Sequence, residues 1–176
     1  PDYLERSLKS IFNAHPSKGD PGKAGHFPVY VSQDGDNERV AAVAKKHGAA
    51  RIVHPRRTLK FSKNSFLAKS PGYAYLCVHY GWALGQLFDD AKRYEGVVIL
   101  EEDIEVAPDF FSSFEATAPL LYRDPTLLTV SGFNDNGHAS VASDPTVAYR
   151  SDFFPGLGWL LTRPLWHELE GKWPEE

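Results

Sequence analysis

The chain has 176 residues, of which 42% are hydrophobic and 24% charged, values ordinary for one soluble globular domain. Its formal net charge of -4 gives no basic excess, which argues against a nucleic-acid partner. No apolar run reaches the roughly 18 residues that span a bilayer, and the single cysteine, Cys77, can form neither an intrachain disulfide nor a cysteine metal site. There is no methionine, so we expect residues 1–176 to be one catalytic domain, partial at both ends, of a longer protein.

Strand-like and helix-like segments alternate along the chain, which predicts an α/β fold. In the first half, the spacing of apolar residues predicts helices over 2–14, 38–48 and 74–88. Short apolar runs predict strands over 27–31 and 50–53, with a polar turn at 32–35. Gly48 is suited to end the second helix. A basic, irregular loop is expected over 55–72.

In the second half, the β-branched run 97–100 is typical of a central parallel strand, which is buried on both faces. A helix should begin near Pro108 and bend or end at Pro119. We then expect a strand over 127–133, a turn at 134–137, an elbow at 153–158, a strand over 159–161 and a helix from about 164 to 170. Cys77, Trp82 and Trp166 are interpreted as core residues.

Three carboxylates, Glu101, Glu102 and Asp103, follow the apolar run 97–100 directly. Open α/β sheets bind ligands at the carboxyl ends of their strands. Neighbouring like charges are costly unless a cation lies among them, and oxygen-rich sites suit Mg²⁺, Mn²⁺ or Ca²⁺. The triplet therefore indicates a divalent metal site, although an exposed acidic turn in front of a helix would look the same.

Around this triplet the sequence resembles the N-acetylglucosaminyltransferase I family over roughly residues 27–174. The family-like segments occur in family order: SQD at 32–34, HYGWALGQ at 79–86, VILEEDIEVAPDFF at 98–111, FNDNG at 133–137, SDFFPGLGW at 151–159 and KWP at 172–174. The resemblance implies an α/β GT-A fold with a mixed, mainly parallel sheet flanked by helices. It also implies that the family's first strand and its C-terminal region lie outside this chain.

The resemblance also implies an activity, the inverting transfer of GlcNAc from UDP-GlcNAc to a terminal mannose of an N-glycan, with Mn²⁺. Asp34 would hydrogen-bond the uracil, His79 would lie near the nucleotide, and Glu101 and Glu102 would contact the ribose and sugar. Asp103 would be the metal ligand and Asp152 the catalytic base. A Golgi-lumenal enzyme with an N-terminal membrane anchor outside this chain is implied as well.

Alternatives to these roles remain open from the residues alone. Asp34 could cap its own turn, and a lone histidine in an apolar helix, such as His79, is commonly a core residue. The 134–137 segment could be a structural turn, and Asp152 a loop acid.

The function has alternatives too. The Glu-Glu-Asp triplet is more similar to protein O-mannose β-1,2-N-acetylglucosaminyltransferases, whereas 107–111 and 151–154 are more similar to the N-glycan enzyme. A non-catalytic UDP- or glycan-binding module and a glycosidase, which also uses paired acids, are the other hypotheses.

Overall fold

The computed structural model describes residues 1–19, 26–60, 69–89, 91–92, 94–142, 144 and 146–173. Helices and strands alternate, as the sequence predicts. The elements are α1 (Asp2–Ala14), η1 (Pro16–Lys18), β1 (Tyr30–Asp34), α2 (Glu38–His47), β2 (Ala50–His54), α4 (Pro71–Phe88), β3 (Gly96–Ile99), α5 (Phe110–Arg123), β4 (Val130–Ser131), β5 (Trp159–Thr162), α6 (Arg163–Leu169) and η3 (Glu170–Lys172).

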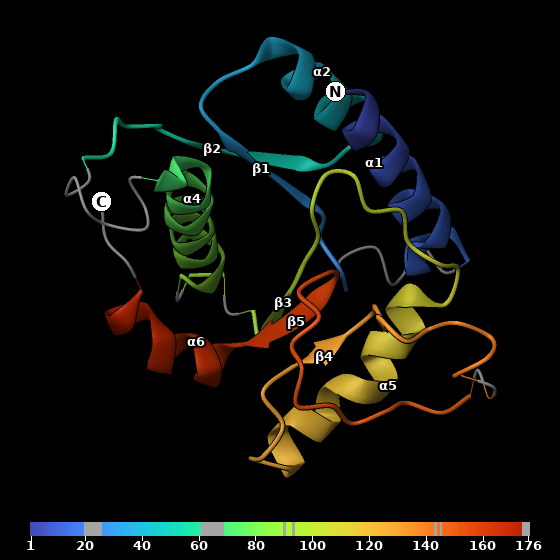
Figure 1. Ribbon diagram of the computed structural model, residues 1–176. Helices are drawn as coiled ribbons and strands as arrows, with labels where there is room; N and C mark the ends of the chain where they lie inside the picture. Colours follow the sequence, from blue (N-terminus) through green and yellow to red (C-terminus); the bar gives the residue numbers. More distant parts are fainter. Residues whose placement is uncertain are drawn as a thin grey trace.

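The strands form two small sheets between helices (Figure 1). In the first, β1 and β2 pair in parallel, with Asp34 opposite His54 at the end of the register. In the second, β5 lies between β3 and β4 and is antiparallel to both. The expectation of a mainly parallel sheet is therefore wrong for the described residues, and the run predicted as a central parallel strand pairs with β5 in the antiparallel sense. The α/β class is confirmed, while the GT-A fold stays a prediction.

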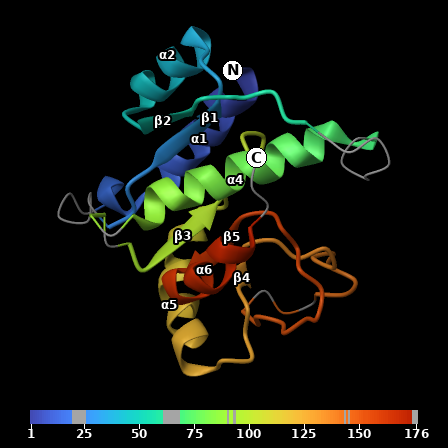
Figure 2. The same cartoon turned by 90° about the vertical axis from the view of Figure 1, so that its left-hand side faces the viewer.

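Two apolar clusters hold the helices against these strands. One joins α1, α2 and β1 to the start of α5, and its buried residues are Leu4, Leu8, Ile11, Val31, Ala44 and Phe111. The other joins α4, β5 and α6 through Leu84, Phe88, Leu161 and Trp166, with Val97 and Ile99 of β3 packed against it. The two clusters place α4 and α6 on one side and α1, α2 and α5 on the other (Figures 1 and 2). The core assignment of Trp166 is confirmed.

Several predicted boundaries shift once partners are known. The first strand begins at Tyr30 and runs to Asp34, because Ser32, Gln33 and Asp34 pair with β2. These three residues, expected in a turn, therefore belong to the strand, and the turn begins at Gly35, whose φ is 80°. The strand predicted over 127–133 is reduced to Val130–Ser131, the two residues that pair with β5.

Helix α5 continues through Pro119 to Arg123, so of the two outcomes predicted at this proline, a bend or an end, the helix does not end there. Proline removes one backbone hydrogen bond, and the carbonyl that loses its partner belongs to residue 115. Glu115 and Pro119 are both exposed, so water can satisfy that carbonyl. The loop predicted over 55–72 is irregular at 55–60, residues 61–68 lie outside the described part, and α4 already begins at Pro71.

Candidate functional site

Asp34 ends β1 at the same sheet edge at which His54 ends β2. The Asp34 Oδ1 lies 2.8 Å from His54 Nδ1, and Asp34 Oδ2 lies 3.4 Å from the Arg56 Nε. The Asp34 side chain is 22% exposed and the His54 side chain 5%. The carboxylate therefore does more than cap its own turn, because His54 of the following strand and Arg56 of the following loop both contact it.

His79 approaches this carboxylate from α4. Its Nε2 lies 2.8 Å from the Ser32 Oγ, and its ring stacks on His54 with centroids 5.7 Å apart and an interplanar angle of 9°. Burial is the main cause that lowers the pKa of His79 below its ordinary value of 6.5, while Asp34 opposes the shift and His54 adds to it. The neutral ring is thus favoured at pH 7. Trp82 packs against both histidines, with its ring centroid 5.1 Å from that of His54 and 6.4 Å from that of His79.

The loop after β2 is tied to the same helix. The guanidinium of Arg56 lies over the Tyr75 ring, 4.8 Å from its centroid. The Tyr75 hydroxyl accepts a hydrogen bond from the Leu59 backbone N–H at 3.2 Å. Arg56 is therefore held from one side by an aromatic face while its Nε meets Asp34. We call Ser32, Asp34, His54, Arg56, His79 and Trp82 the β1–β2 edge cluster.

The acidic triplet follows β3, as predicted. Glu101 is half-buried, whereas Glu102 and Asp103 are exposed, and Ile104 N–H closes a turn on the Glu101 carbonyl at 3.2 Å. The Tyr80 hydroxyl donates to the Glu101 Oε1 at 3.4 Å. Burial first, and then Glu101 and Glu102, raise the pKa of Tyr80 to about 12, so this hydroxyl stays a donor at neutral pH. Consecutive residues of α4, His79 and Tyr80, therefore contact the β1–β2 edge cluster and the triplet.

The triplet carries the oxygen donors that Mn²⁺ or Mg²⁺ takes. No described basic side chain forms an ion pair with Glu102 or Asp103. Among the described residues, no three His, Cys, Asp or Glu side chains converge as a complete metal site. The donors thus fit an ion that takes one or two carboxylates and completes its shell with phosphate and water, and they do not fit an all-protein cage.

Asp152 is exposed at a bend, ahead of the predicted elbow at 153–158. The elbow itself is fixed: the Ser131 Oγ donates to the Pro155 carbonyl at 2.9 Å, and the Gly132 N–H donates to the Gly158 carbonyl at 2.7 Å. Gly158 has φ 62°, and a Cβ there would lie 3.2 Å from Leu100, the residue before the triplet. The elbow thus approaches the segment that carries the acids, although its aromatic residues Phe153 and Phe154 are exposed.

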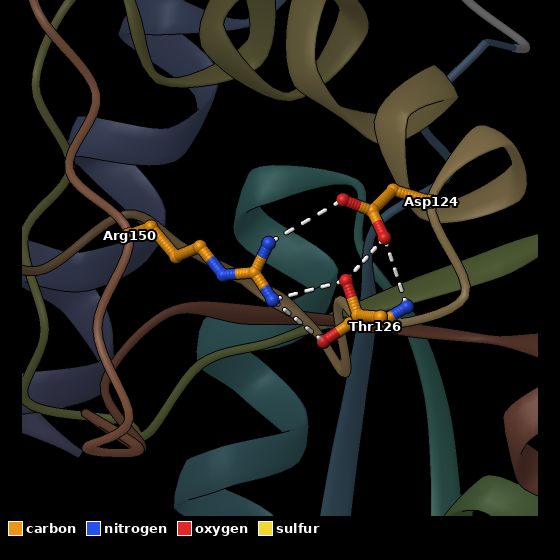
Figure 3. A network of polar contacts seen from close by, with 3 residues as sticks. All are labelled: Asp124, Thr126 and Arg150. Atoms are coloured by element: carbon orange, nitrogen blue, oxygen red, sulfur yellow. Dashed lines mark hydrogen bonds and ion pairs between the residues drawn. The ribbon is translucent and has the colours of Figure 1, made fainter.

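Arg150 anchors the chain shortly before Asp152 (Figure 3). Its guanidinium donates to the Thr126 Oγ1 at 2.9 Å and to the Thr126 carbonyl and the Asp124 Oδ2 at 3.4 Å. The pKa of Asp124 is lowered, chiefly by hydrogen bonds from Thr126 and also by Arg150. This network ties the loop to the turn after α5, two residues from the predicted base.

The structure thus joins Asp34 to His79 and links the helix that carries His79 to Glu101. No hydrogen bond or ion pair among the described residues brings Asp103, the predicted metal ligand, together with Asp152, the predicted base. A surface hollow at the start of α1, lined by Pro1, Asp2, Tyr3 and Arg6, contains none of the predicted site residues. The 134–137 segment forms a turn, closed by Gly137 N–H on the Asn134 carbonyl at 2.9 Å.

Sequence reasoning missed His54 as a site residue and treated Arg56 as part of a basic loop. A signal was present, because the two short strands flank one helix, and such units pair in parallel with their carboxyl ends at one edge. Polar residues that end both strands should then meet. Trp82, interpreted as a core residue, is half-buried and belongs to the β1–β2 edge cluster. Cys77 is half-buried as well, where a buried position was expected.

The model of the GNT-I family matches residues 1–176. The chain is also similar to an Arabidopsis thaliana protein named alpha-1,3-mannosyl-glycoprotein 2-beta-N-acetylglucosaminyltransferase, with 41% identity over 178 residues. The match covers 99% of this chain and 38% of that relative, so the chain spans little more than a third of the relative's length. None of the described helices has the length and apolar character needed to cross a membrane.

Proposed function

This chain belongs to the GNT-I family, and we propose that the protein transfers GlcNAc from UDP-GlcNAc to a terminal α-mannose of an N-glycan with inversion. The single observation that supports this most strongly is the arrangement around α4. His79 lies in the cluster around Asp34, and the next residue, Tyr80, contacts the first acid of the triplet. One helix therefore joins a polar group suited to a nucleobase to carboxylates suited to a sugar and a metal-bound diphosphate.

Asp34 is suited to read the uracil. An ionised carboxylate only accepts hydrogen bonds, and uracil N3 carries a hydrogen that it can donate. The half-buried position of Asp34 shields such a bond from water, which strengthens it. Neutral His79 lies beside this position, and Glu101 and Glu102 would contact the ribose and sugar of the donor.

The triplet would serve the leaving group. Asp103 is the proposed protein ligand of Mn²⁺, which when bound supplies positive charge that stabilises a departing diphosphate. Glu102 and Asp103 are exposed and without a described cationic partner, so they are available for this purpose. Tyr80 donates a hydrogen bond to Glu101, which is half-buried, unlike the exposed pair.

The reaction we propose is one displacement. The acceptor hydroxyl attacks the anomeric carbon from the face opposite UDP, the bond to the diphosphate oxygen breaks, and the configuration inverts. Asp152 would accept the proton of the hydroxyl. Two features support Asp152 in this role: the family-like segment 151–159, and the fixed elbow that follows the residue. Among the described residues, its carboxylate has no side-chain partner that would compete with the acceptor. A glycoprotein acceptor fits a secretory compartment, and we propose the Golgi lumen.

A transfer assay tests the proposal. The full-length protein is incubated with UDP-GlcNAc, Mn²⁺ and either a mannose-terminated N-glycan or an O-mannosyl peptide. Transfer to the N-glycan, its loss with a chelator, and its loss in Asp103→Asn with the fold retained would support the assignment. Transfer to the O-mannosyl peptide alone would assign the related activity that the Glu-Glu-Asp triplet resembles. UDP binding without transfer would indicate a binding module, and turnover unaffected by chelator would contradict the metal role.

A further inference from the structure

We propose that His54 is a positioning residue that sets the selectivity of this site for uracil over cytosine, by fixing the carboxylate of Asp34. This inference rests on the proposed function, in which Asp34 receives the uracil N3–H. His54 itself need not touch the nucleotide, because its side chain is 5% exposed and its Nδ1 points to Asp34 at 2.8 Å.

The bond defines the proton on the imidazole. A carboxylate only accepts, so the Nδ1 of His54 carries the hydrogen that is shared with Asp34 Oδ1. Arg56 faces the other oxygen, Oδ2, at 3.4 Å, but its side chain is 56% exposed and therefore holds it less firmly. A carboxylate has about four lone-pair positions, and the Asp34 side chain is 22% exposed, so acceptor capacity remains for a ligand.

The His54 ring is itself held in place. His79 stacks on it in nearly parallel orientation, with centroids 5.7 Å apart, and Trp82 packs at 5.1 Å with a tilt of 40°. Ser32 fixes His79 through a 2.8 Å hydrogen bond. The strand register sets the backbone as well, since Asp34 and His54 are direct partners in the β1–β2 ladder. The Asp34 carboxylate is consequently preorganised before any ligand arrives.

Preorganisation gives the selectivity. Neutral uracil presents a donor at N3, whereas neutral cytosine presents an acceptor there and would face the fixed carboxylate acceptor to acceptor. Sites built around a buried polar partner reject analogues that leave it unpaired. A carboxylate released from His54 could rotate, meet water, and tolerate cytosine. We therefore expect loss of His54 to reduce discrimination between UDP and CDP more than it reduces binding of the diphosphate.

Two matched variants isolate the Nδ1 hydrogen bond. His54→Asn and His54→Gln introduce the same amide, but only the asparagine nitrogen takes the place of Nδ1 on the side chain. The full-length protein with Mn²⁺ is titrated calorimetrically with UDP and with CDP, and thermal unfolding checks the fold. We expect the UDP preference to fall about 10-fold or more in His54→Gln, and to be largely restored in His54→Asn.

The variant Asp34→Ala tests the proposed uracil contact separately from the role of His54. If Asp34→Ala keeps the UDP preference, the proposed uracil contact itself is wrong. If Asp34→Ala loses the preference but His54→Gln keeps it, the uracil contact stands and the role of His54 is overturned. Equal loss in His54→Gln and His54→Asn would also overturn it, because ring packing, and not the Nδ1 bond, would then be responsible. If His54→Gln does not fold, the inference is decided by His54→Asn, in which a wild-type preference supports it.

Discussion

The substitution Gly81→Ala should destabilise the protein although alanine is the better helix former. Gly81 lies inside α4, and a Cβ at this position would be 2.6 Å from the Trp173 Nε1 and closer still to its Cδ1. The indole is fixed there, because its N–H donates to the Cys77 carbonyl at 2.8 Å and its ring packs 5.6 Å from that of Trp166. An added methyl group must therefore displace a side chain with its own hydrogen bond.

The magnitude follows from three terms. Alanine in place of glycine gains about 1 kcal/mol of helix propensity. Overpacking a well-filled contact costs about 1–3 kcal/mol, and loss of the indole hydrogen bond costs about 1 kcal/mol. The expected net loss is thus about 1–3 kcal/mol. Gly85 lies one turn further along α4, and an added Cβ there would meet no atom within 4 Å apart from its chain neighbours and the backbone of its own helix, so Gly85→Ala should gain about 1 kcal/mol.

A double-mutant cycle provides the assay. The free energy of unfolding is measured by urea denaturation, followed by far-UV circular dichroism, for Gly81→Ala with and without Trp173→Ala. Once the indole is removed, Gly81→Ala should become stabilising by about 1 kcal/mol, which gives a coupling of about 2–4 kcal/mol. Equal stability of Gly81→Ala and Gly85→Ala, or a coupling near zero, would refute the contact between Trp173 and α4.

Three further predictions concern catalysis and pH. Asp152→Asn should keep UDP binding and lower turnover about 10²–10⁴-fold, and near-normal turnover would assign the base to another residue. Tyr80→Phe removes the hydrogen bond to Glu101 and should weaken binding of UDP-GlcNAc by about 0.5–1.5 kcal/mol. Because burial and the nearby acids raise the pKa of Tyr80 to about 12, this difference should stay constant from pH 6 to 9. A change across that range would contradict the role of the Tyr80 hydroxyl as a hydrogen-bond donor. Glu5 has its pKa lowered by hydrogen bonds from Lys46 and His47, so it stabilises the fold above its ordinary pKa of 4.5 and loses this contribution as pH falls through the depressed value. Glu5→Gln should therefore lower the unfolding temperature at pH 7 and cease to do so in strong acid, and an equal effect at both pH values would count against the ion pairs.

Helices that bury one local face were predicted almost to the residue. The helix over 2–14 is α1, Asp2–Ala14, because its apolar residues recur at helical spacing and pack on one side. The second helix ends at Gly48, whose φ of 75° is a conformation that glycine adopts readily. Both features depend on neighbouring residues alone, so sequence spacing suffices to predict them.

Strand partners could not be predicted in the same way. The run at 97–100 was expected beside parallel neighbours, yet β3 pairs with β5, some sixty residues later in the chain, and β5 also takes β4. Alternating or continuous apolar residues show that a strand is buried, but not which strand lies beside it. The first and last residues of β4 likewise depend on which of its residues form backbone hydrogen bonds with β5.

Composition, local periodicity and ordered motifs are properties of contiguous residues, and they were enough to predict the α/β class, the family and an acidic triplet at the end of a strand. The packing of distant segments was needed to show that His54 and Arg56 contact Asp34, that Tyr80 contacts Glu101, and that Trp173 fills the space beside Gly81. His54 meets Asp34 through strand pairing, and Arg56 follows in the loop after β2. The other two contacts arise where helix α4 packs on distant segments. These side chains come into contact because burial of apolar surface brings the elements together, and local sequence patterns do not predict such long-range contacts.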